Sequence, residues 1–230
     1  MKKILLIISV VFASLISNGQ MFYGHNQDNS RGGYGLLYNW YSASDANFAP
    51  TDWKVPEYTE FQLLITALDL SPGAKAKETG YTHWDSPNTD ATNSSGFTGF
   101  GTGHRYTSGL FSLLKQYGYF WTTTSYNSTQ SYGYILAYNS NAFTSATPYK
   151  YAGQAIRLIY IGVGTPTTVT DYDGNVYDVV LIGTQYWTVQ NWKCTHLKDG
   201  TAIPEVTNST TWAGLTTGAW CYYNNDPLNK

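Results

Sequence analysis

Aromatic residues set the strongest constraint on how this chain can fold. The sequence holds 21 Tyr, 8 Trp and 9 Phe among 230 residues, interspersed with Ser, Thr, Asn and Gly. Disordered chains are poor in aromatic residues, whereas strands favour aromatic side chains and turns favour Gly and Asn. The composition therefore predicts an ordered, β-rich protein with long loops.

One segment, 57–70, predicts a helix instead. Its apolar residues recur at i, i+3, i+4 and i+7: Phe61, Leu64, Ile65 and Leu68. Pro56 precedes the segment, and Glu57 and Glu60 lie in its first turn, where carboxylates favour a helix start. A short helical turn is also expected over 110–115.

Several short segments rich in aromatic and β-branched residues predict strands. They are 119–123, 132–138, 155–161, 168–170, 176–182 and 185–189. Asp173-Gly174-Asn175 and Gly183-Thr184 supply turns in the second half of the chain. We therefore predict an α+β fold, mostly antiparallel β, with one or two helices.

The first 19 residues have the layout of a secretion signal. Lys2 and Lys3 precede an apolar run over 4–16, and small residues lead to a cut after Gly19. The run is too short to span a bilayer, and no later stretch approaches the roughly 20 apolar residues that a span needs. We expect a secreted chain without a membrane span, with 1–19 as signal peptide and 20–33 as a polar segment. A buried N-terminal helix is the alternative.

The charge pattern excludes one class of partner. The formal net charge is −2, charged residues make up 12% of the chain, and no Lys/Arg cluster follows Lys3. A protein that binds nucleic acid through phosphates needs a basic face. We therefore expect no nucleic-acid partner.

The chain contains two cysteines, Cys194 and Cys221. A secreted protein meets an oxidising environment, in which disulfides form and persist. We therefore predict a disulfide between Cys194 and Cys221; two separate buried thiols are the alternative.

An ordered set of short motifs covers most of the chain. The set includes YGLLYNWY at 34–41, APTDWKVP at 49–56, GYFWTTT at 118–124, AIRL at 155–158, DYDGNVY at 171–177 and YYNND at 222–226. Together they resemble the Fibrobacter succinogenes major paralogous domain family, which occurs in secreted bacterial proteins. The resemblance implies a C-type-lectin-like fold similar to that of formylglycine-generating enzymes, and a bacterial location that is secreted or cell-surface.

The order of these motifs departs from the family. There the motif like 171–177 comes first, whereas here the C-terminal half, 34–160, precedes the N-terminal half, 169–230, across the connection 161–168. Either the chain joins pieces of two domains, or it is one circularly permuted domain. We expect the permuted domain, with 155–161 pairing with 168–182, because an isolated half would leave an apolar face uncovered.

Catalytic and metal-binding patterns are absent from the sequence. The copper-binding cysteines of formylglycine-generating enzymes have no match at Cys194 or Cys221, and no Gly-x-Ser-x-Gly motif occurs. The histidines lie apart from other ligands except in Cys194-x-His196, which we interpret as two ordinary residues. We therefore predict no catalytic residue, no metal ligand and no cofactor.

The Asp171-x-Asp173-x-Asn175 motif superficially suggests a calcium loop. Its glycine, Gly174, precedes Asn175 instead of following it, and the distal bidentate Glu is missing. The motif therefore predicts a turn. A structural Ca²⁺ elsewhere in the loops stays open.

Residues 117–151 are the richest in Tyr, Ser and Asn. Alternate strand tyrosines there are expected in the core, while Tyr and Asn in turns stay exposed and suit sugar or protein contacts. The candidate ligand-binding residues are Tyr126, Asn127, Tyr132, Tyr134, Asn139 and Asn141.

These features favour a secreted, non-catalytic binding or display module that recognises a glycan or a surface protein. A structural or spacer unit of the envelope or matrix is the alternative. An enzyme is a third hypothesis, which requires a cleft that joins His104 and Arg105 to a carboxylate.

Overall fold

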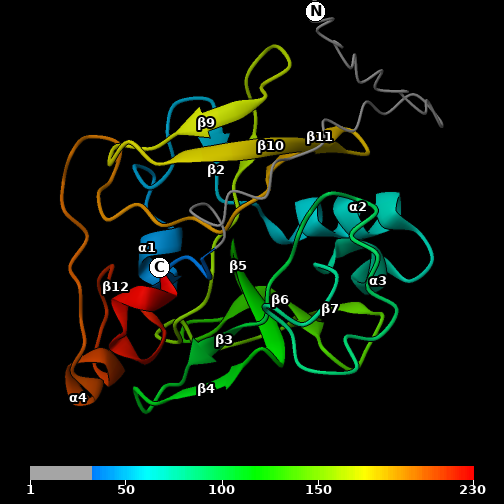
Figure 1. The fold of residues 1–230 in the computed structure, drawn as a ribbon. Coiled ribbons are helices and arrows are strands. Elements are labelled where there is room, and N and C mark those ends of the chain that lie inside the picture. The colour runs from blue at the N-terminus through cyan, green and yellow to red at the C-terminus, as the bar shows by residue number, and fades with distance from the viewer. Residues whose placement is uncertain (1–32) are drawn as a thin grey trace, which may run out of the picture.

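The computed structural model describes residues 33–230, so the predicted signal peptide and nearly all of the polar segment 20–33 lie outside the described residues. Most of its strands pair antiparallel, in two five-stranded sheets and one two-stranded sheet. In Figure 1 one large sheet lies above the other, and the helices α2 and α3 lie to one side. The predicted α+β class with mostly antiparallel strands is confirmed.

The longest helix, α2 (Tyr58–Leu68), is the one that the sequence predicts. The Glu60 carboxylate accepts a hydrogen bond from the Glu57 backbone N–H at 2.7 Å, which caps the first turn. Phe61 and Leu64 are fully buried on its inner face. Three shorter helices accompany it where one or two helices in all were expected: α1 (Trp40–Ala43), α3 (Pro72–Ala76) and α4 (Ser209–Ala213).

The lower sheet has the order β4-β3-β5-β6-β7 and comes entirely from the first segment, 34–160. Its strands are β3 (Thr102–Arg105), β4 (Phe111–Leu114), β5 (Tyr117–Ser125), β6 (Ser131–Ala137) and β7 (Phe143–Ala146). The helical turn expected over 110–115 is wrong, because that stretch forms β4 and pairs with β3. Leu113 and Lys115 have φ values of 66° and 63°, which a right-handed helix cannot contain.

The upper sheet contains strands of the first segment, 34–160, and of the second segment, 169–230. Its order is β2-β8-β11-β10-β9. Its strands are β2 (Trp53–Lys54), β8 (Ile159–Tyr160), β9 (Thr168–Thr170), β10 (Val176–Ile182) and β11 (Gln185–Thr188). The expected direct pairing of 155–161 with 168–182 is wrong: β8 pairs with β11 through Ile159 and Trp187. Strands β10 and β11 form a hairpin, and β11 lies between β8 and β10.

A third contact joins the start of the first segment to the end of the second. Strand β1 (Leu37–Tyr38) pairs antiparallel with β12 (Trp220–Cys221), which the short helices η2 (Tyr223–Asn225) and η3 (Pro227–Asn229) follow. The main cores also mix the segments: one packs Leu36 and Trp121 with Trp192, and another packs Phe61 with Trp187.

Two buried arginines tie loops of different segments together. Arg157 donates to the carbonyl oxygens of Phe97, Thr98, Thr188 and Val189 and to Asn191 Oδ1. Arg105 donates to the carbonyl oxygens of Val206 and Thr207 in the second segment. Loop carbonyls outside a strand ladder need donors, and the guanidinium groups supply them.

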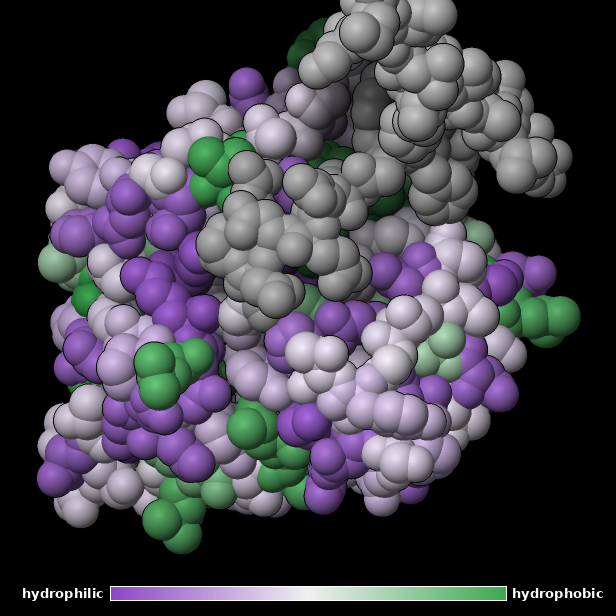
Figure 2. Space-filling model, viewed as in Figure 1, coloured by the Kyte–Doolittle hydropathy of each residue, from purple (hydrophilic) through white to green (hydrophobic). Residues whose placement is uncertain are grey.

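The surface in Figure 2 is largely hydrophilic or of intermediate hydropathy, with apolar residues in small separate groups. Among the described residues, no helix combines the length and the apolar character that a membrane crossing requires.

Candidate functional site

A cavity of about 270 Å³ lies where the two segments meet, and we call it the junction cavity. Its lining residues are Phe48, Pro50, Thr51, Thr170, Asp171, Tyr172, Trp192, Cys194, His196 and Lys198. The first three come from the loop before β2, and the others come from β9 and the loops around β10 and β11. The fold thus brings together residues that are more than a hundred positions apart.

Aromatic rings pack tightly behind the cavity. Trp192 stacks on Tyr177 with ring centroids 4.3 Å apart, and Phe48 meets Tyr38 edge-on at 5.1 Å. The Tyr38 hydroxyl donates to the carbonyl oxygen of Cys194 at 2.7 Å. All four rings are nearly or fully buried, so this wall is rigid.

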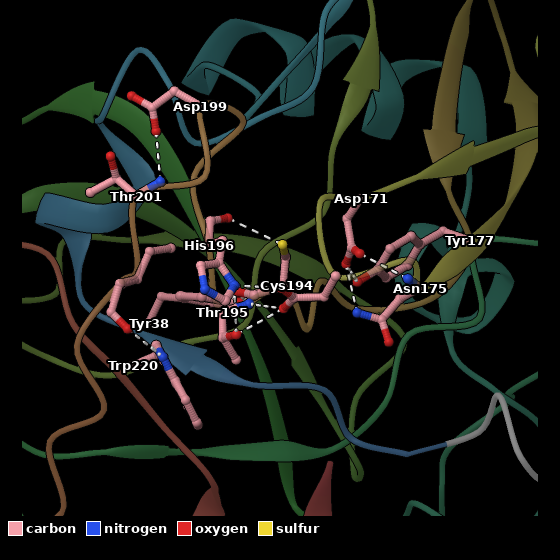
Figure 3. A network of polar contacts seen from close by, with 12 residues as sticks. Tyr38, Asp171, Asn175, Tyr177, Cys194, Thr195, His196, Asp199, Thr201 and Trp220 are labelled. Atoms are coloured by element: carbon pink, nitrogen blue, oxygen red, sulfur yellow. Dashed lines mark hydrogen bonds and ion pairs between the residues drawn. The ribbon is translucent and has the colours of Figure 1, made fainter.

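Asp171 closes the turn that its motif predicts, as Figure 3 shows. Its carboxylate accepts hydrogen bonds from the Tyr177 hydroxyl at 2.6 Å and from both the backbone N–H and the side-chain amide of Asn175 at 2.8 Å. Gly174 takes the positive φ of 81° inside this turn. The carboxylate oxygens are therefore engaged with their own turn.

Asp173 anchors His196 at the edge of the cavity. His196 Nδ1 lies 2.5 Å from one carboxylate oxygen of Asp173, and the other oxygen accepts from the Thr195 backbone N–H at 2.6 Å and hydroxyl at 2.8 Å. Partial burial acts to raise the pKa of Asp173, but the hydrogen bonds from Thr195 and His196 hold it below its ordinary value. The His196 ring lies beside Tyr172, with centroids 5.2 Å apart.

The predicted disulfide is wrong in this structure, because Cys194 and Cys221 are separate free thiols. Cys194 belongs to the core around Trp192, whereas Cys221 packs with Trp212 in a different cluster. Burial raises the pKa of each thiol to about 12, so both stay protonated near neutral pH. The Cys194 Sγ donates to the carbonyl oxygen of His196 at 3.1 Å, which agrees with two ordinary residues in Cys194-x-His196.

The residues expected to bind a ligand do not form one site. Tyr126, Asn127 and Tyr132 lie at the tip of the β5–β6 hairpin, whereas Asn139 and Asn141 lie in the turn between β6 and β7. The seven residues of β6 separate these two turns by about 20 Å. The residues at each end therefore need separate functional explanations.

Tyr134, one of the candidate ligand-binding residues, is buried in the core, so it is not available to a ligand at the surface. Its side chain is 2% exposed and stacks on Phe61 of α2, with centroids 4.6 Å apart. Tyr134 lies in mid-strand beneath the helix, whereas Tyr132 lies two residues nearer the hairpin tip and stays partly exposed. Burial raises the pKa of the Tyr134 hydroxyl.

His104 and Arg105, which the enzyme hypothesis requires in a cleft with a carboxylate, pack against aromatic rings. His104 stacks on Tyr119 at 4.4 Å, and burial lowers its pKa to about 4. The Arg105 guanidinium is buried among backbone carbonyls, with Trp212 over its face at 4.4 Å. Neither belongs to any ion pair among residues 33–230.

The described residues contain no group of three or more His, Cys, Asp and Glu side chains that could hold a metal ion. Sequence reasoning missed most of the cavity lining, including Thr51, Trp192 and Lys198, because nothing in the sequence joins such distant loops. The one local signal was the motif 171–175, whose turn exposes Tyr172 beside the cavity.

The geometry defines a mixed α+β protein of mostly antiparallel strands, with an aromatic-walled cavity between two interlocked segments. The family model described as the Fibrobacter succinogenes major domain matches residues 12–159, and the chain belongs to this family. No curated protein and no solved structure matches the chain. Most of the cavity lining, from Thr170 to Lys198, follows the matched residues.

Proposed function

We propose that this chain is a secreted, non-catalytic recognition module of C-type-lectin-like fold at the bacterial cell surface, and that its junction cavity binds one sugar residue of a glycan. The observation that carries the proposal is the cavity itself, which combines an aromatic wall with a rim of hydroxyl, imidazole and ammonium groups. Secretion rests on the signal-peptide layout of residues 1–19.

The size of the cavity favours a small ligand. Its volume of about 270 Å³ lies below the roughly 300–1,000 Å³ of pockets that enclose drug-sized molecules. A single sugar ring matches such a space better than a peptide does. The rest of a glycan would then extend into solvent past the exposed side chain of Tyr172.

The chemistry of the lining fits a sugar. Tyr172 is 59% exposed and offers a flat apolar face with a polar end, which suits the two-sided character of a sugar ring. The side chains of Thr51, Thr170 and Lys198 add hydrogen-bond donors around it. Binding should cost little side-chain entropy, because the aromatic side chains of the wall are already packed.

The thiol and the carboxylates at the cavity support binding without catalysis. The Cys194 thiol stays protonated, the Asp171 carboxylate is hydrogen-bonded within its own turn, and the Asp173 carboxylate is hydrogen-bonded to Thr195 and His196. A nucleophile or general base needs a free, suitably ionised group within reach of a ligand. These groups instead hold the shape of the site.

Glycan-array screening followed by calorimetric titration tests the proposal, with the chain 20–230 and two tyrosine variants. Tyr172→Ala should weaken sugar binding about tenfold, which corresponds to about 1.4 kcal/mol. Tyr81→Ala is the matched control, because Tyr81 is 60% exposed and does not line the cavity. A blank array, or equal effects of the two variants, would contradict the proposal and favour a structural or spacer unit.

A further inference from the structure

Two tyrosines near the tip of the β5–β6 hairpin and one at the start of α2 form an aromatic surface, and none of the three lines the junction cavity. We call Tyr58, Tyr126 and Tyr132 the hairpin-tip surface. Tyr132 lies between the other two, with centroid distances of 4.4 Å to Tyr58 and 5.3 Å to Tyr126. Tyr126 is 52% exposed, and the other two are partly exposed.

Local hydrogen bonds hold this surface in place. Asn127 Oδ1 accepts from the backbone N–H groups of Thr129 at 2.9 Å and Gln130 at 2.8 Å, which fixes the tip. The Tyr58 N–H donates to Thr124 Oγ1 at 2.9 Å, and the buried Tyr134 hydroxyl donates to the Tyr58 carbonyl oxygen. The backbone that carries the rings is therefore fixed, which lowers the entropy cost of ordering this surface on binding.

The charge pattern decides what kind of partner fits. Residues 116–149 contain no Asp, Glu, Lys, Arg or His. The nearby Lys54 is paired with Glu57 at 3.1 Å and Glu60 at 2.8 Å. Lys150 lies over the Trp40 ring at 4.2 Å and is 8% exposed. A charged partner would meet no unpaired counter-charge here, so the desolvation of its charge would not be offset. An uncharged partner has no such cost.

The composition of the tip also disfavours a protein partner. Protein interfaces are enriched in Arg and Met beside aromatic residues and bury an apolar centre. Residues 116–149 contain no Arg or Met, and their exposed large hydrophobic residues are Tyr126 and Tyr149 alone. The tip instead exposes the hydroxyl and carboxamide groups of Ser125, Asn127 and Thr129. Such a surface suits the C–H faces and hydroxyls of sugars.

We propose that the hairpin-tip surface binds an uncharged polysaccharide, as a second site that acts independently of the junction cavity. The polymer lies across the partly exposed rings of Tyr126, Tyr132 and Tyr58, and its hydroxyls bond to the tip. The cavity takes one sugar residue, whereas this surface contacts several along a chain.

Retention of the chain 20–230 on insoluble polymers tests the second site. The uncharged polymers are a β-1,4-glucan powder and a chitin powder, and a polygalacturonate gel is the charged comparison. We expect retention on at least one uncharged polymer, unchanged up to 1 M salt because no ionic contact is involved. Tyr126→Ala with Tyr132→Ala should lower that retention about tenfold, and Tyr81→Ala should leave it unchanged.

Tyr132 is partly buried, so Tyr126→Ala alone serves as a second variant whose thermal unfolding should match that of the unmodified chain. Four outcomes would overturn the proposal. They are no retention on either uncharged polymer, retention only on polygalacturonate, loss of retention with salt, and full retention by both variants. Failure of the cavity is distinguishable, because Tyr172→Ala should weaken monosaccharide binding about tenfold without changing retention on the powders.

Discussion

The two cysteines show how residue environment overrides residue type. A secreted chain with two cysteines ordinarily favours a bridge, yet Cys194 and Cys221 pack into different cores with their thiols buried. Burial disfavours the thiolate, so the pKa of each rises to about 12. Each thiol then behaves as a small apolar side chain.

We predict that both thiols are free and slow to react in the native chain. With a thiol reagent at pH 8 and no reductant, reaction should be slow in native buffer and reach two thiols per chain in denaturant. A protein that shows no reactive thiol in denaturant would contain the disulfide and contradict the structure. The thiols ionise near pH 9 in the unfolded chain and near 12 in the native one. The free energy of unfolding should therefore fall as pH rises from about 9 to about 12, because the unfolded chain releases these protons first.

Buried Lys and Arg side chains are a second feature at the scale of residues. Lys77, Arg105 and Arg157 are fully buried, and the main partners of all three are backbone carbonyl oxygens. Lys77, for example, donates to the carbonyls of Thr89 and Ala137 at 3.0 Å and of Ser140 at 2.8 Å. Burial lowers the pKa of Arg157 to about 9, so it stays charged at neutral pH. These side chains satisfy carbonyls in loops and at strand ends.

At the scale of elements, the helix and the second-segment strands follow their sequence patterns closely. Helix α2 keeps the predicted inner face, and β9 and β10 have the predicted bounds. Strand β4 does not, because its apolar residues alone do not reveal the positive φ values of Leu113 and Lys115. The β3–β4 ladder determines that backbone, and no strand was predicted over residues 102–105 to pair with it.

We predict that the cap of helix α2 contributes measurably to stability. Glu60→Ala should lower the free energy of unfolding by about 1 kcal/mol, because it removes the acceptor for the Glu57 N–H and the 2.8 Å pair with Lys54. Urea unfolding monitored by circular dichroism measures the change. Gln62→Ala, at an exposed position of the same helix, is the control and should change stability by less than about 0.5 kcal/mol. If the two substitutions lowered the free energy of unfolding equally, the cap would not be the source of the stability.

At the scale of the whole molecule, the two segments interlock. Strand β8 pairs with β11, β1 pairs with β12, and Arg105 and Arg157 bridge loops of both segments. The connection between the segments is exposed, with Val163 100% accessible. The covalent link between them is thus a small part of what holds them together.

We predict that the chain survives a cut in this connection, as a single permuted domain should. With a protease site inserted after Val163, the cleaved chain should elute as one particle in native buffer and keep its circular dichroism spectrum. Arg105→Met should make the cleaved fragments separate at lower urea, while the uncut chain gives the reference. Two fragments that separate in native buffer would show that the segments do not form one domain.

The sequence by itself determined the elements whose signals are local: the apolar face and first turn of α2, the bounds of β9 and β10, and the turn closed by Asp171. Propensity, periodicity and turn chemistry act over a few residues, so they can be recognised without the fold. The set of short motifs likewise indicated the family to which the chain belongs.

Only the tertiary structure decided which distant residues meet. It separated Asn139 and Asn141 from Tyr126, buried Tyr134 under α2 and kept the two thiols apart. It also assembled the junction cavity from loops that precede β2 and surround β10 and β11. The physical reason is that burial and long-range contact depend on how apolar faces pack against each other, and no single stretch of sequence encodes that choice.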